Sequence, residues 1–165
     1  MFKTRDLVLA GLLLAIGIIL PTIVHLTGIS GAVFLPMHIP VLISGFVLGP
    51  ALGGIIGFIT PLLNYSLTGM PPAPVLWIML AELSFYGILS GLLYRNVRMN
   101  LILSLILSMI GGRIVAALTL LILAKGFGIT MPPLMTYVYG MTVTAIPGIV
   151  IQLILIPTLV KAIDN

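Results

Sequence analysis

Cysteine is absent from this chain of 165 residues, and charge is scarce. Without cysteine there is no disulfide framework, no thiol nucleophile and no thiolate metal site. Only 6% of the residues are charged, whereas a soluble domain uses about 25%. Because 61% of the residues are hydrophobic, the exterior must face a lipid bilayer, which predicts an integral membrane protein. Seven cations are spread along the chain without forming a patch, so nucleic acid is not an expected partner.

Motifs of catalysis are missing as well. The sequence shows no serine–histidine–aspartate order, no paired catalytic aspartates, no Walker lysine and no metal-ligand spacing. His25 and His38 have no carboxylate near them in the chain that would complete a metal site. We therefore expect a protein that is not an enzyme and that has no cofactor and no metal site. An ATPase that drives it must be on another chain.

Long apolar runs separated by glycine- and proline-rich breaks predict the membrane spans. Length allows one membrane domain over residues 1–165, because at about 20 residues per span the chain holds five or six spans. Residues 27–35 are expected to be irregular, and three prolines within 71–74 predict a loop. The apolar run after Lys3 and Arg5 is long enough to be a retained first helix rather than a signal peptide. The predicted spans are 7–26, 36–49, 50–63, 75–94, 101–124 and 137–160.

The topology depends on whether residues 39–63 form one span or two. With a break at Gly49-Pro50 and the N-terminus inside, five cations lie inside and only Lys125 lies outside. One span would leave three cations on each side. The positive-inside bias therefore favours an all-α bundle of six transmembrane helices with both termini cytoplasmic. The second helix is then short, about 21 Å, so it must be tilted or begin below the membrane surface.

Small residues recur at every fourth position and predict close helix packing. The main ridge is Gly45, Gly49, Gly53 and Gly57. In lipid such ridges let helix backbones approach one another, so packing within the bundle is the expected role. For the strip of Gly11 and Ala15 on the first helix, docking of another membrane protein remains the alternative.

Two ionisable residues lie deep within predicted spans. Glu82 is 15 residues before Val97 and Arg113 is 16 residues after it, so both lie at nearly the same depth on antiparallel helices. An ion pair near mid-membrane is expected, because either charge alone is very unfavourable there. The pair is either a structural clamp or part of the wall of a solute pocket.

A pocket is predicted in the outer half of the bundle, covered by the loop 70–74. Its walls would combine aromatic faces with a few polar groups. His25 is expected to be interfacial, Tyr137 to lie in the aromatic belt, and Gln152 to join helices. The predicted binding residues are His38, Asn64, Trp77, Glu82, Tyr86, Arg113 and Tyr139.

Seven segments spread over nearly the whole chain have a recognisable pattern. They are FLPMHIPVLISGFVLGP at 34–50, TPLLN at 60–64, LTGMPP at 67–72, ELSFYG at 82–87, GR at 112–113, AIPG at 145–148 and IQLILIP at 151–157. Together these segments resemble the substrate-binding S components of energy-coupling-factor (ECF) vitamin transporters.

The resemblance implies a six-helix binding subunit of an importer in the plasma membrane of a prokaryote, with a vitamin pocket near the outer face. Its implied partners are a transmembrane coupling (T) subunit and two cytoplasmic ATPases. The helix-one docking motif of the family maps onto Gly11 and Ala15, with Ala10 beside them, and Gly11 stands where alanine is usual.

The sequence leaves more than one class of substrate open. If Glu82 and Arg113 neutralise each other, a flat neutral heteroaromatic is expected, such as dimethylbenzimidazole, its riboside or a hydroxymethylpyrimidine. If Arg113 is free, an acid such as pantothenate or folate fits better. The alternative functions are a stand-alone proton-coupled transporter that uses Glu82 as a relay and a purely structural membrane subunit.

Overall fold

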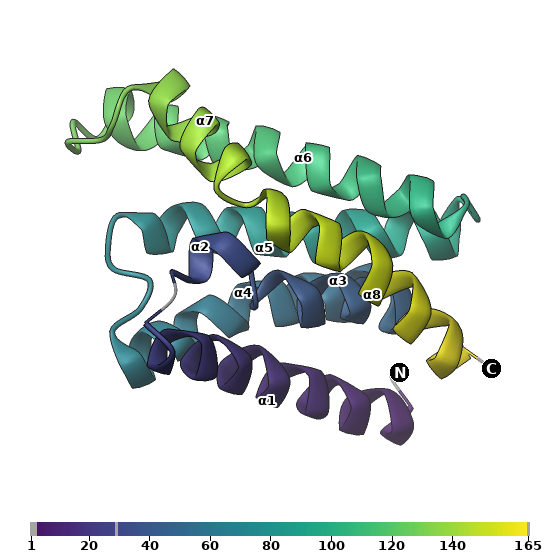
Figure 1. The fold of residues 1–165 in the computed structure, drawn as a ribbon. Helices are drawn as coiled ribbons and strands as arrows, with labels where there is room; N and C mark the ends of the chain where they lie inside the picture. The colour runs from purple at the N-terminus through teal and green to yellow at the C-terminus, as the bar shows by residue number, and fades with distance from the viewer. Residues whose placement is uncertain (1–2, 29, 165) are drawn as a thin grey trace.

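The computed structural model describes residues 3–28 and 30–164, which form a bundle of helices (Figure 1). Two of the α-helices continue into short π-helical turns, η1 after α5 and η2 after α6. The elements are α1 (Thr4–Leu26), α2 (Gly31–Phe34), α3 (His38–Leu48), α4 (Pro50–Thr68), α5 (Val75–Gly91), η1 (Leu92–Asn96), α6 (Leu101–Leu121), η2 (Ile122–Gly126), α7 (Leu134–Val143) and α8 (Ile146–Asp164).

Six helices of the described chain are long and apolar enough to cross a membrane. They are α1, α2 with α3, α4, α5 with η1, α6 with η2, and α8. The predicted all-α fold with six spans is therefore confirmed. The start of α1 and the end of α8 lie at the same end of the bundle (Figure 1), as an even number of spans requires. We call the opposite end of the bundle the distal end.

The apolar run 39–63 divides into two helices at Gly49, as the charge count predicts. Gly49 has a φ of 91°, a conformation that glycine adopts without steric cost, and Pro50 begins α4. The resulting α3 has only 11 residues and is almost entirely buried. Val41, Leu42 and Phe46 have no exposed surface. This short helix is thus the centre of the bundle, with α1, α4, α5 and α8 packed around it.

The glycine ridge packs α3 and α4 against α5. A methyl group on Gly53 would lie 2.5 Å from the Gly87 carbonyl oxygen, and one on Gly57 would overlap the Leu83 backbone. A methyl group on Gly87 would in turn overlap the Gly53 carbonyl. The predicted role in packing within the bundle is therefore confirmed for these glycines, whose missing side chains allow backbone contact.

Two predictions about helix limits are wrong. The last span, predicted as a single helix over 137–160, is divided into α7 and α8 by a turn at Thr144 and Ala145. Pro147 explains the break, because proline disfavours a helical conformation in the residue before it and is tolerated only in a first helical turn. The stretch 27–35, predicted as irregular, contains the one-turn helix α2, where the Ser30 hydroxyl oxygen accepts from the Ala32 N–H.

Candidate functional site

A cavity of about 290 Å³ lies toward the distal end of the bundle. It is near the lower end of the size range of ligand pockets, about 300–1,000 Å³. Residues of α1, α2, α3, α5, α6 and α7 surround it, together with the loops between α2 and α3 and between α4 and α5. Its lining residues are Pro21, His25, Ser30, Gly31, Ala32, Leu35, Pro36, Met37, His38, Met70, Pro71, Pro72, Val75, Met79, Glu82, Arg113, Tyr137 and Met141.

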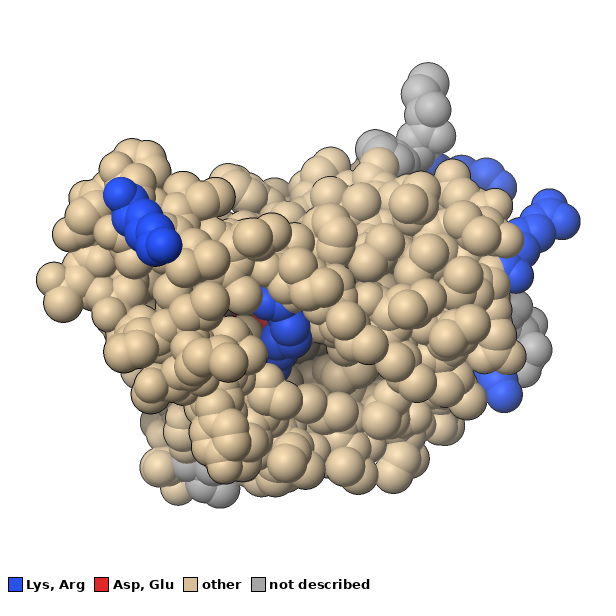
Figure 2. Space-filling view, turned by 90° about the horizontal axis from the view of Figure 1, so that it is seen from above, with Lys and Arg blue, Asp and Glu red and all other residues tan. Residues whose placement is uncertain are grey.

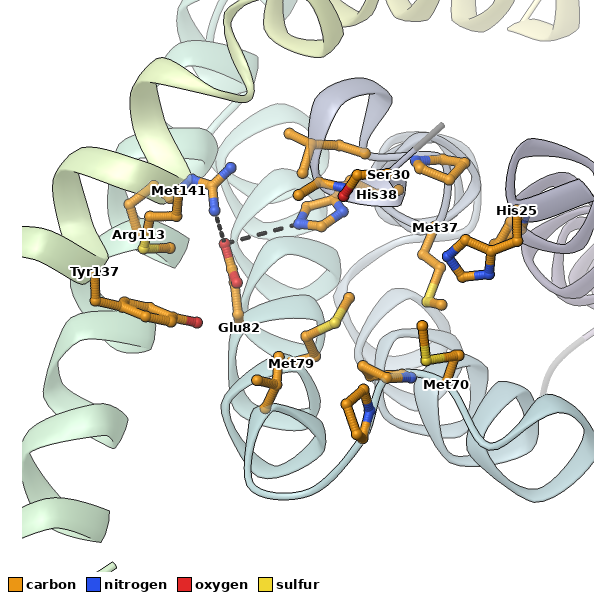
Figure 3. A pocket seen from close by; sticks show the side chains of 18 residues that line it. His25, Ser30, Met37, His38, Met70, Met79, Glu82, Arg113, Tyr137 and Met141 are labelled. Carbon is orange, nitrogen blue, oxygen red and sulfur yellow. Dashed lines mark hydrogen bonds and ion pairs between the residues drawn. The ribbon is translucent and has the colours of Figure 1, made fainter. Parts of the chain in front are cut away.

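One wall of the cavity contains a charged cluster centred on Glu82 (Figure 3). Arg113 Nη1 donates to Glu82 Oε1 at 3.0 Å, and the Tyr86 hydroxyl donates to the same oxygen at 3.2 Å. His38 Nε2 lies 3.7 Å from that oxygen, beyond the usual hydrogen-bond range of about 2.7–3.2 Å. Glu82 is only 2% exposed, so Arg113 is the counter-charge that makes burial of its carboxylate tolerable.

The sequence positions this cluster through helical spacing and a gap on α6. Glu82 and Tyr86 are four residues apart on α5, so they lie on one face of that helix. A methyl group on Gly112 would lie 2.5 Å from the Tyr86 ring, so the ring occupies the space above this glycine. The Tyr86 hydroxyl is also 3.3 Å from the Met109 carbonyl oxygen of α6. Tyr86 therefore holds Glu82 opposite Arg113, the next residue after Gly112.

The cluster keeps hydrogen-bonding capacity that the protein does not use. Arg113, Tyr86 and His38 all approach Oε1, and Glu82 Oε2 has no hydrogen-bond partner within residues 3–28 and 30–164. Both ring nitrogens of His38 are buried without a hydrogen bond. The Arg113 side chain is 19% exposed and lines the cavity. An unsatisfied buried polar group is costly, so these groups suit a ligand that completes their hydrogen bonds.

The remaining walls are apolar and flexible. Four methionines from four segments line the cavity, and their thioethers are polarizable and adapt to the shape of a ring. They are Met37, Met70, Met79 and Met141; Figure 3 shows the first three toward the His25 side of Glu82 and Met141 beside Arg113. Figure 2 shows a hollow in one side of the molecule with basic atoms and a trace of an acidic side chain inside it. The surrounding surface of this side carries almost no charge.

The predicted binding residues separate into three groups in the structure. His38, Glu82 and Arg113 line the cavity, and Tyr86 lies behind Glu82. The predicted ion pair is present, and since it also forms part of the cavity wall, the clamp and the pocket are one arrangement. The loop predicted to cover the pocket contributes lining residues, as expected.

Three of the predicted residues lie away from the cavity. Asn64 is 1% exposed, and its amide nitrogen donates to the carbonyls of Gly17 and Thr60, each at 3.0 Å, so it joins α4 to α1. Trp77 is 53% exposed and Tyr139 is 70% exposed, so both rings lie on the outer surface. Gln152 donates to the Leu35 carbonyl at 3.5 Å, which agrees with its predicted role between helices.

Sequence reasoning missed several lining residues. Tyr137 lines the cavity from α7, whereas the sequence predicts a place in the aromatic belt. His25 also lines the cavity rather than only the interface. A signal for the methionines was present, because Met79 is three residues before Glu82 and therefore on the same helix face.

The proposed docking strip lies on an open face of α1. Gly11 and Ala15 are exposed, Ala10 is partly buried, and a methyl group on Gly11 would meet nothing within 4 Å. The surrounding exposed residues of α1 are apolar: Leu7, Val8, Leu12, Ile19 and Ile23. This smooth face remains available to lipid or to a partner.

Fold and site together define a multi-pass membrane protein with a ligand-sized internal cavity. The family model described as ECF transporter, substrate-specific component, matches residues 5–160. The chain therefore belongs to this family, and it is a binding subunit in the plasma membrane of a prokaryote rather than an enzyme. Membership also favours a binding subunit over a stand-alone proton-coupled transporter. Comparisons with curated proteins and with solved structures found no match.

Proposed function

We propose that the protein captures a flat, neutral heteroaromatic vitamin or vitamin precursor in the cavity lined by Glu82 and Arg113. The observation that carries this proposal is the 3.0 Å ion pair between these two side chains. Because the two charges neutralise each other, the wall offers hydrogen bonds but no net charge. A neutral ligand can use these hydrogen bonds without bringing a charge that lacks a partner.

The hydrogen-bonding groups suit the edge of a nitrogen heterocycle. A ring N–H or amino group can donate to Glu82 Oε2, and a ring nitrogen can accept from Arg113. The Tyr137 ring and the methionine side chains provide the apolar faces between which such a ring fits. Benzimidazoles and aminopyrimidines have this combination of a flat apolar face and a polar edge.

An acidic vitamin is the weaker candidate. A carboxylate such as that of pantothenate or folate would compete with Glu82 for Arg113. Glu82 is 2% exposed, so losing its cationic partner would leave a buried charge uncompensated. The cavity therefore favours a neutral ligand over an anion.

Charge and surface support the proposed orientation and the proposed partners. Basic residues gather at the end that holds the termini, where η1 and the last turn of α8 carry Arg95 and Lys161. By the positive-inside bias this end is cytoplasmic, so the cavity is near the outer face. The strip of Gly11 and Ala15 on α1 docks the transmembrane coupling subunit, and two cytoplasmic ATPases supply the energy for release.

A thermal-stability screen of the detergent-purified protein tests the proposal. The panel is dimethylbenzimidazole, its riboside, hydroxymethylpyrimidine, pantothenate and folate. At 100 times its dissociation constant a ligand adds about 2.7 kcal/mol of stability, so a clear rise in melting temperature is expected for a neutral heteroaromatic. Glu82→Gln should abolish the rise, because the amide cannot maintain the pair with Arg113.

The control is Ser66→Ala, which removes an exposed hydroxyl near the end of α4 that donates to the Leu62 carbonyl of the same helix. It should bind as the wild type does. If only pantothenate or folate stabilises the protein, the neutral-ligand proposal is wrong. If no compound in the panel stabilises it, the vitamin-binding proposal loses its support.

A further inference from the structure

A second polar group lines the cavity opposite the charged cluster. His25, in the last turn of α1, faces the cavity (Figure 3). Its imidazole makes no hydrogen bond to any residue that the structure describes. A neutral imidazole offers one donor and one acceptor. The cavity therefore has hydrogen-bonding groups on two sides, Glu82 on α5 and His25 on α1.

The surroundings of His25 are polar but uncharged. A methyl group on Gly31 would lie 3.2 Å from His25 Nε2, so the ring lies against the start of α2. Ser30, the residue before it, also lines the cavity. The Ser30 hydroxyl oxygen accepts from Ala32 N at 3.3 Å, which leaves its O–H free to donate. Among the lining residues that the structure describes, Arg113 is the one lysine or arginine, and it is paired with Glu82 on the other side of the cavity.

The space between the two polar sides is apolar. Met37, Met70 and Met79 lie between Glu82 and His25 in Figure 3. A ring held at Glu82 would cover this thioether surface, and a substituent on that ring could extend toward α1. The cavity thus has one end that suits a heterocycle edge and another that suits a neutral hydroxyl group.

We propose that the substrate has two parts: a nitrogen heterocycle held by Glu82 and a hydroxylated substituent, such as a sugar, held by His25 and Ser30. This inference rests on the proposed function and adds to it a second contact, between His25, Ser30 and the substituent. Hydroxyl groups match the unused donor and acceptor of His25 and the free O–H of Ser30. A phosphate or carboxylate at this end would not meet a lysine or arginine of residues 3–28 and 30–164, because Arg113 of the cavity wall is paired with Glu82.

Calorimetric titration in detergent tests the second group. The probes are the riboside of dimethylbenzimidazole and 1,5,6-trimethylbenzimidazole, which is called the base below. Both lack a ring N–H and keep the same acceptor nitrogen, so they differ only in whether N1 carries a sugar or a methyl group. One or two added hydrogen bonds at about 1 kcal/mol each should make the riboside bind roughly fivefold to thirtyfold tighter than the base. His25→Leu should remove most of this advantage while leaving the affinity for the free base within about twofold.

Two further variants separate contact from general damage. His25→Gln keeps a donor and an acceptor and should restore part of the preference for the riboside. Ser66→Ala, away from the cavity, should leave the preference unchanged. Unchanged affinity of the His25→Leu variant for the base shows that this variant is folded.

The outcomes distinguish the two proposals. The proposed contact of His25 and Ser30 with the sugar is wrong if the base binds as tightly as the riboside. It is also wrong if His25→Leu lowers the affinity for both probes equally. In either case the proposed function stands. If neither probe binds the wild type, a benzimidazole does not bind at Glu82, and the proposal of a two-part substrate is wrong as well.

Discussion

Removing both members of the Glu82–Arg113 pair should separate stability from binding. Arg113→Leu alone leaves the Glu82 carboxylate 2% exposed, with Tyr86 as its remaining hydrogen-bond donor. Loss of one partner of a buried ion pair costs about 3–5 kcal/mol. The double variant Glu82→Leu with Arg113→Leu removes the uncompensated charge. Its stability should return to within about 1 kcal/mol of the wild type, because apolar replacement of a buried pair is often neutral.

The structure supports this recovery in detail. The Tyr86 hydroxyl keeps a second acceptor, the Met109 carbonyl at 3.3 Å, when Glu82 is replaced. His38 loses no hydrogen bond, since its ring nitrogens make none in the present arrangement, and only its 3.7 Å contact with Glu82 Oε1 is removed. The double variant should nevertheless fail to bind any neutral heteroaromatic that stabilises the wild type, because the polar edge of the cavity is gone.

Thermal unfolding in detergent, with and without dimethylbenzimidazole riboside, measures both effects. For a chain of this size 1 kcal/mol corresponds to a shift of about 2–4 °C, so the single variant should melt roughly 6–20 °C lower. Lys161→Leu, which removes an exposed cation, serves as the control and should change little. A double variant as unstable as the single one would refute the pairing argument. A double variant that still binds would show that the pair is only a clamp.

Three further outcomes are expected. Gly87→Ala should lower stability by about 1–3 kcal/mol in thermal unfolding, because its methyl group would overlap the backbone of α4; unchanged stability would contradict the backbone contact. Asn64→Leu should lower the free energy of unfolding by about 1–3 kcal/mol, since it removes the hydrogen bond to a carbonyl of α1. Ligand affinity should stay the same. A loss of affinity would show that Asn64 contributes to ligand binding. Gly11→Leu with Ala15→Leu should preserve ligand binding but reduce co-purification with the coupling subunit, and full retention of the complex would argue against docking through α1.

The spans were predictable because lipid imposes a simple composition rule. An apolar run of sufficient length must be helical to satisfy its backbone, and the positive-inside bias resolved the single ambiguous run. Glycine packing was also readable, since spacing of four residues defines a ridge on a helix. The break before Ile146-Pro147 was missed although Pro147 signalled it, because proline is also tolerated inside membrane helices, as Pro21 is in α1.

The sequence predicted the depth of the site residues in the membrane, but not which way each of them faces around its helix. Glu82 and Arg113 could be matched because two antiparallel helices joined by a short turn fix equal depths. Trp77 is five residues from Glu82, about 140° around the helix, and so lies on the outer surface. Tyr137 and Tyr139 are about 200° apart, so only one of them can face the cavity. Which one does so depends on how α7 packs, and the α7–α8 break sets that packing.

The most direct test of the central claim is native mass spectrometry of the detergent-purified protein, with identification of the small molecules it releases. The account predicts one neutral heteroaromatic compound bound per chain, displaced or absent in Glu82→Gln. A bound acid such as pantothenate, or a neutral compound retained equally by Glu82→Gln, would contradict the claim that the neutralised Glu82–Arg113 pair selects the substrate.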